Sequence, residues 1–95
     1  MLEAMARLEE LAAAARRAEE LTSEWGTRRF VGRADEGRIV ATTDALGALV
    51  ELEIHPVSRK RLDARRLGDE ILAAVVQAEA AAAAAKDELM DDLRP

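Results

Sequence analysis

The apolar residues at the start of the chain recur every three or four positions, and this spacing constrains the fold more than any other feature. They stand at positions 2, 5, 8, 11, 12, 15, 18 and 21, with charged residues between them, close to the 3.6-residue period of a helix. We predict one helix from Leu2 to Glu24, ended by the TSEWG segment, whose Gly26 is a natural stop. At about 1.5 Å per residue this helix would be roughly 35 Å long, so we expect part of it to pack on a second chain.

Residues 27–55 change to the pattern of short strands. Three segments, TRRFVGRA, GRIVATT and ALVELEIH, are separated by DEG and DALG, and Asp and Gly between β-branched segments indicate hairpin turns. In the third segment apolar residues at 50, 52 and 54 alternate with polar ones at 51, 53 and 55. One face of the sheet should therefore be dry and the other wet. Pro56 lacks an N–H donor and closes this strand.

A second long helix is predicted after a basic loop. Asp63 is suited to the N-cap, and apolar residues follow helical spacing from 67 to 93. We expect this helix over about 64–93, with close helix packing at its EAAAAAAK segment because alanine is small and the strongest helix former. The predicted fold is α+β in the order α-β-β-β-α: a long N-terminal helix, a three-stranded antiparallel meander and a long C-terminal helix, as one domain over 1–95.

The composition bounds what kind of protein this is. The chain has 95 residues, no cysteine, and only Trp25 and Phe30 as aromatic residues, so its core is thin and self-association would stabilise it. Without cysteine there is neither a disulfide frame nor a Cys-based zinc site. The N-terminus lacks the basic start and apolar run of a secretory signal, and no stretch approaches the roughly 20 apolar residues of a membrane span. We expect a cytoplasmic protein with no membrane contact.

No constellation of residues favours catalysis. His55 is the only histidine, and Ser58 is the one potential nucleophile near it, whereas a histidine at a strand end is usually a solvated loop residue. Glu51 and Glu53 share the wet face, which commonly keeps a sheet soluble. The acidic pairs of the last helix lie at its C-terminal end, where the helix dipole disfavours negative charge, and GRADEGR lacks the features of a phosphate loop. We expect no enzyme, no cofactor and no metal.

Positive charge is concentrated in the middle of the chain. The net charge is −5, yet residues 26–66 carry nine basic and six acidic groups, while the flanking segments are acidic. The candidate DNA-binding residues are the nine basic ones: Arg28, Arg29, Arg33, Arg38, Arg59, Lys60, Arg61, Arg65 and Arg66. Eight are arginine, whose guanidinium fork suits phosphate. The alternative is scattered surface charge, with Arg61, Arg65 and Arg66 paired to neighbouring acids.

The order of the elements, with GRIVATTDALGALVELEIHP from Gly37 to Pro56 and the amphipathic LGDEILAAVVQAEA that follows, resembles the YbaB/EbfC family of bacterial nucleoid-associated proteins. In that family the strand commonly ends in Asp-Pro, whereas here it ends in His55-Pro56. The resemblance implies a homodimer formed through its sheets, with the long helices projecting as arms, that binds DNA with little sequence preference. No short motif carries the DNA-binding residues of the family, so none is transferred to this sequence.

Two functions follow as hypotheses. The first is a dimeric DNA-binding protein of the nucleoid, with a role in nucleoid organisation or gene regulation, that contacts phosphates through the nine basic residues. The second is an acidic dimeric protein-interaction or adaptor module, whose Ala-rich helices dock a protein partner without DNA. The second is motivated by the net charge of −5 and by the acidic C-terminal segment KDELMDDLRP.

Overall fold

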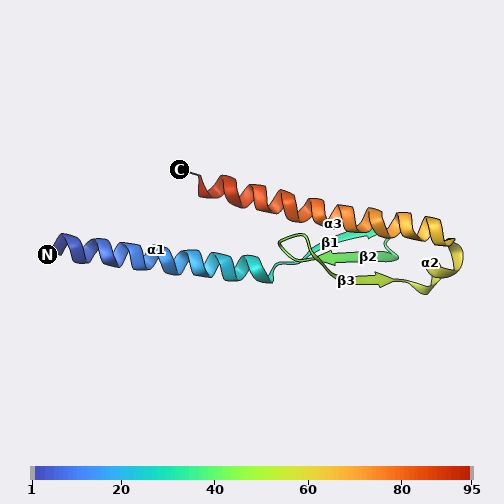
Figure 1. Ribbon diagram of the computed structural model, residues 1–95, viewed down its shortest axis with the longest axis horizontal. Coiled ribbons are helices and arrows are strands. Elements are labelled where there is room, and N and C mark those ends of the chain that lie inside the picture. Colours follow the sequence, from blue (N-terminus) through green and yellow to red (C-terminus); the bar gives the residue numbers. More distant parts are fainter. Residues whose placement is uncertain (1, 95) are drawn as a thin grey trace.

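The part of the chain that the structure describes forms six elements in an elongated arrangement. The computed structural model describes residues 2–94, and its elements are, in chain order, α1 (Leu2–Thr27), β1 (Phe30–Ala34), β2 (Ile39–Thr43), β3 (Leu49–Ile54), α2 (Pro56–Arg61) and α3 (Ala64–Leu93). The predicted order of a long helix, a meander and a long helix is confirmed (Figure 1). The molecule measures 73 × 21 × 16 Å, and α1 extends from one end of the sheet.

The segment after β3 differs from the prediction, which made it a loop. It forms the six-residue helix α2 with Pro56 at its start, a position that suits proline because the first N–H groups of a helix have no partner within it. The Nδ1 atom of His55 accepts a hydrogen bond from the N–H of Val57 at 3.1 Å and so caps this helix. The strand β3 ends just before His55 and Pro56, as the sequence predicts, but these two residues also begin the helix α2.

The three strands form an antiparallel meander in the order β1-β2-β3. Gly32 pairs with Ala41, and Ala41 pairs with Leu52, so these three residues share one face of the sheet. The pairing of β2 with β3 shifts between Thr42 and Thr43, where the strand is irregular. The predicted alternation of β3 is therefore retained at Leu52, which lies on the face that carries the core.

Small residues allow α3 to lie very close to β1 and β2. Ala74, Ala78 and Ala82 are one helical turn apart on α3 and are 0, 0 and 2% exposed. Ala74 and Ala78 lie over Gly32, where an added Cβ would be 1.9 Å from the carbonyl oxygen of Ala74. Within the run at 80–85 only Ala82 is buried, and it packs with Phe30 of the sheet. The expected close packing thus occurs, but against the sheet rather than against another helix.

The two edges of the sheet differ. At β1, side chains of α3 accept hydrogen bonds from backbone N–H groups that point away from β2. Gln77 Oε1 lies 2.5 Å from the nitrogen of Arg33, and Glu70 Oε2 lies 3.0 Å from the nitrogen of Asp35.

The strand β3, at the other edge, is exposed. None of its residues is buried, and Leu52 is 37% exposed. The apolar face is therefore dry over β1 and β2, but the expectation of a dry face is wrong at β3, because α3 does not cover that strand in the single chain.

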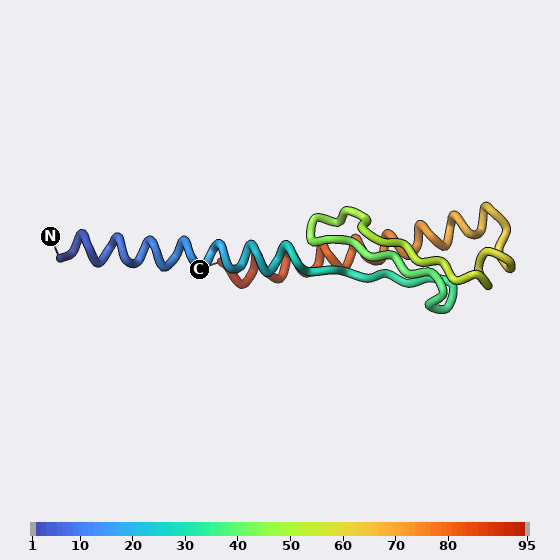
Figure 2. Tube along the Cα trace, turned by 90° about the horizontal axis from the view of Figure 1, so that it is seen from below, coloured from blue at the N-terminus to red at the C-terminus, as the bar shows by residue number. Residues whose placement is uncertain are grey.

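The helix α1 joins the remainder of the molecule at its C-terminal end. It continues through Gly26 to Thr27, beyond the predicted end at Glu24, and the Trp25 ring lies 6.0 Å from the ring of Phe30. No residue of α1 is buried. Two perpendicular views show that the first half of α1 extends beyond the end of α3 (Figure 1, Figure 2).

Candidate nucleic-acid interface

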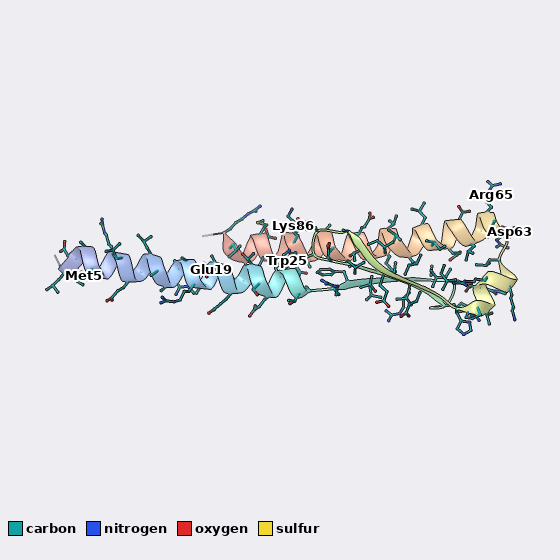
Figure 3. All side chains as sticks on the ribbon, turned by 60° about the horizontal axis from the view of Figure 1, so that its bottom comes forward. Met5, Glu19, Trp25, Asp63, Arg65 and Lys86 are labelled. Carbon is teal, nitrogen blue, oxygen red and sulfur yellow. The ribbon has the colours of Figure 1, made fainter. Side chains whose placement is uncertain are left out.

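Most of the candidate DNA-binding residues come together at one end of the molecule. The turn between β1 and β2, the helix α2 and the first turn of α3 meet there, opposite the end from which α1 extends (Figure 1). We call this end the basic tip; its basic residues are Arg38, Arg59, Lys60, Arg61, Arg65 and Arg66. Figure 3 shows the basic tip at Asp63 and Arg65, far from Met5 near the other end.

Asp35 organises the basic tip from the turn between β1 and β2. Its Oδ2 accepts a hydrogen bond from the Ser58 hydroxyl at 2.5 Å, and its Oδ1 forms an ion pair with the guanidinium of Arg61. The guanidinium of Arg38 lies 3.8 Å from the same Oδ1 and 3.1 Å from Glu36 Oε2. Two of the six cations of the tip are therefore neutralised within the protein, and α2 is fixed to the turn.

The environment of Asp35 lowers the pKa of its carboxyl group. The hydrogen bond from Ser58 makes the largest contribution, and the positive charges of Arg61 and Arg38 act in the same direction. Burial opposes them, because the side chain is only 6% exposed and desolvation favours the neutral acid. The net direction shows that the site holds the carboxylate as an anion.

We expect the stability that Asp35 contributes to be present at neutral pH and lost in acid. Its folded pKa lies below the value of about 3.9 for an unfolded chain, so the unfolded state binds more protons as the pH falls through this interval, and the free energy of unfolding falls. Urea denaturation should show the native chain to be more stable than Asp35→Asn at pH 7, with a difference that shrinks below about pH 4. A difference independent of pH would contradict this assignment.

Four cations of the basic tip have no acidic partner among residues 2–94. Arg59, Lys60, Arg65 and Arg66 are exposed, and none of them forms an ion pair with a described residue. Thus the alternative of pairing to acids holds for Arg61 but not for Arg65 and Arg66. The last two lie in the first turn of α3, where the helix dipole disfavours positive charge. This arrangement gives the helix no stability, but it suits contact with an external anion.

The other three candidate residues lie away from the basic tip. The Arg28 guanidinium lies 5.3 Å from the Trp25 ring and 5.0 Å from the Phe30 ring, and so has a packing role at the start of the sheet. Arg29 donates hydrogen bonds to the backbone oxygens of residues 26 and 28. Arg33 is exposed and pairs with Val40 on the face of the sheet opposite α3. The structure therefore divides the nine residues instead of forming one patch.

No local sequence pattern indicates the contacts that organise the basic tip. Asp35 and Ser58 are 23 residues apart, and Asp35 and Arg61 are 26 apart. The turn places them together because Asp35 and Glu36 both adopt positive φ angles, of 48° and 58°, as in a type I′ hairpin turn. His55, considered first as a catalytic base, instead caps α2.

The fold and the basic tip define a class of small α+β protein with an exposed cationic end. No group of three or more potential metal ligands occurs among the residues that the structure describes. The chain belongs to the YbaB/EbfC DNA-binding family, whose model matches residues 1–94. This match confirms the predicted membership, and the family is a nucleoid-associated one.

Comparison with solved structures supports the same fold. The chain is similar to the uncharacterized protein HP0035 from Helicobacter pylori, with a TM-score of 0.69 and 15% identity over 88% of this chain and 98% of that one. A search of curated proteins gives no significant match. Between residues 2 and 94, none of the helices has the length and apolar character needed to cross a membrane.

Proposed function

We propose that the protein is a nucleoid-associated DNA-binding protein of the cytoplasm, which contacts backbone phosphates through the basic tip. The observation that carries this proposal is the set of four exposed cations at the tip without an acidic partner among the described residues: Arg59, Lys60, Arg65 and Arg66. Lysine and arginine bind phosphate by displacing condensed counterions, and such contacts carry little sequence information. The proposed role is nucleoid organisation or gene regulation without sequence preference.

We further propose that the functional unit is a homodimer formed through β3. An exposed edge strand has unpaired backbone N–H and C=O groups that favour pairing with another strand. Here the β3 edge also exposes apolar side chains, because Leu49, Val50 and Leu52 are 48, 49 and 37% exposed. The other edge is closed by Gln77 and Glu70. A two-fold pairing of β3 with β3 would place a basic tip on each subunit.

The experiment that tests DNA binding is a titration of duplexes with the native chain at increasing salt. If four phosphates are contacted, the affinity is expected to fall about a hundredfold between about 50 and 200 mM salt. Duplexes of unrelated sequence should bind within a few-fold of one another, because phosphate contacts do not read bases. Absence of binding to any duplex at micromolar protein would contradict the proposal.

That negative result would leave the acidic adaptor module as the alternative. One observation favours it: no residue of α1 is buried, and this helix carries six acidic and three basic residues. The two functions are separated by the partner recovered with the native chain, which is nucleic acid for the first and a stoichiometric protein for the second.

A further inference from the structure

A buried carboxylate lies within the basic tip, where its charge opposes the binding of phosphate. The side chain of Asp35 is 6% exposed, and its pKa is lowered, so it is an anion at neutral pH. Like charges repel, and a neutral residue here would favour an anionic ligand. The turn does not require the charge, because asparagine tolerates the positive φ of this position as aspartate does. The charge of Asp35 therefore has another role.

Asp35 connects the two helices that carry the unpaired cations. Its carboxylate accepts a hydrogen bond from the Ser58 hydroxyl at 2.5 Å and pairs with the guanidinium of Arg61, and both of these residues lie on α2. Its backbone N–H donates a hydrogen bond to Glu70 Oε2 of α3 at 3.0 Å. The turn is thus joined to α2 by a side chain and to α3 by the backbone. One residue therefore links the positions of α2 and α3.

The helix α2 depends on this link because few of its side chains pack on the protein. It has six residues, and a helix this short is not stable by itself in water. Ser58 is its one buried residue, and the other five are exposed. Its Arg59 and Lys60 are two of the four unpaired cations of the tip. Leu62, which follows the helix, packs partly buried against the core. Loss of the Asp35 contacts would leave α2 attached mainly through its ends.

A fixed α2 matters because the phosphates of a duplex have a regular spacing. The cations of α2 and those of α3 contact phosphates of one backbone together only when both helices are held in one arrangement. If a charged segment is free to move, its ordering on binding costs conformational entropy, which lowers the affinity. A link that holds α2 in place before DNA binds removes this cost.

We propose that Asp35 is a positioning residue for phosphate binding, which holds α2 through Ser58 and Arg61 so that the cations of both helices contact one DNA backbone together. This role rests on the DNA contact proposed above. A negative charge at the tip then strengthens the binding of a negatively charged ligand, because the gain in position exceeds the repulsion. Total charge alone predicts the opposite sign.

Two single substitutions in the same turn separate position from charge. Asp35→Asn and Glu36→Gln each change the net charge from −5 to −4, but the Glu36 side chain is 76% exposed and its ion pair joins it to Arg38 of the same turn. Glu36→Gln should bind duplexes about two- to fivefold more tightly at low salt. Asp35→Asn should bind more weakly, by about fivefold or more, because an amide cannot hold Arg61 and α2 is released. Equal tightening in both variants would overturn the proposal.

The salt dependence distinguishes a positioning role from a loss of folded protein. If Asp35→Asn merely lowered the folded fraction, the affinity would fall by the same factor at every salt concentration, and the slope of log affinity against log salt would stay native. If α2 is released, the contacts of Arg59 and Lys60 are lost, and the slope should be flatter by up to about 1.8 per tip. Fluorescence anisotropy measures the slope, and circular dichroism shows that the variant is folded at the assay temperature. A native slope in this variant would refute the positioning role.

A second pair of variants tests the same link without a change of charge. Ser58→Ala removes the buried hydroxyl that donates to Asp35. Ser23→Ala is the matched control, because Ser23 is exposed on α1. We expect Ser58→Ala to weaken duplex binding by about threefold or more, with a flatter salt slope, and Ser23→Ala to bind as the native chain does. Native affinity in both serine variants would show that α2 needs no link to Asp35 for DNA binding.

Failure of this role and failure of DNA binding give different results. If the native chain binds duplexes, and Asp35→Asn and Glu36→Gln both bind them more tightly, the tip binds DNA but Asp35 does not position it. If the native chain binds no duplex at micromolar protein, DNA binding itself fails, and the positioning role fails with it.

Discussion

Replacement of Gly32 by alanine is expected to destabilise the fold by about 3 kcal/mol or more, at the upper end of the usual cost of overpacking. The added Cβ would lie 1.9 Å from the carbonyl oxygen of Ala74 and 2.6 Å from the nitrogen of Ala78. Both are backbone atoms of α3, so no rotation of a side chain can relieve the clash. The helix must move away from β1, and the measurement is the free energy of unfolding from urea denaturation followed by circular dichroism.

The control is the same substitution in the same chain at Gly68. This glycine lies within α3, and an added Cβ there has no neighbour within 4 Å. Alanine is a better helix former by about 1 kcal/mol, so Gly68→Ala should stabilise the protein. Opposite signs at positions 32 and 68 would support the packing of α3 on β1. A native unfolding midpoint for Gly32→Ala would show that this packing is not as described.

The sequence predicts the elements of this fold better than their packing. The change of apolar period from helical to alternating locates the two long helices and the three strands, because this period reflects which face of each element is buried. Gly32 occurs in a predicted strand, but its requirement for glycine comes from Ala74 and Ala78, more than 40 residues away. No local pattern contains that contact.

The same limit applies to the candidate site. The basic middle of the chain correctly indicates where cations gather, since α2 and the first turn of α3 are adjacent in sequence. Arg61 could not be distinguished from Arg59 by sequence, because its partner Asp35 is brought near by a turn 26 residues earlier. Separation of paired from unpaired cations therefore requires the three-dimensional structure.

The largest effect on function is expected from removal of the four unpaired charges of the basic tip. The variant Arg59→Gln, Lys60→Gln, Arg65→Gln, Arg66→Gln should weaken duplex binding by about a hundredfold or more at low salt, uniformly across sequences. Each lost phosphate contact removes about 0.9 from the slope of log affinity against log salt, so the slope of the variant should be flatter by about 3.6 per tip. Filter binding or fluorescence anisotropy at several salt concentrations measures both quantities.

A matched pair of double variants separates position from net charge. Arg59→Gln with Lys60→Gln and Lys86→Gln with Arg94→Gln each remove one arginine and one lysine, so both change the net charge of the chain from −5 to −7. Lys86 lies in the C-terminal half of α3, away from the basic tip (Figure 3), and Arg94 is the C-cap residue directly after this helix. If only the total charge governs binding, the two variants will lose affinity equally. The four-cation site instead requires a loss of about tenfold or more for the tip variant, and near-native affinity for the other, since phosphate contact depends on where the cations lie.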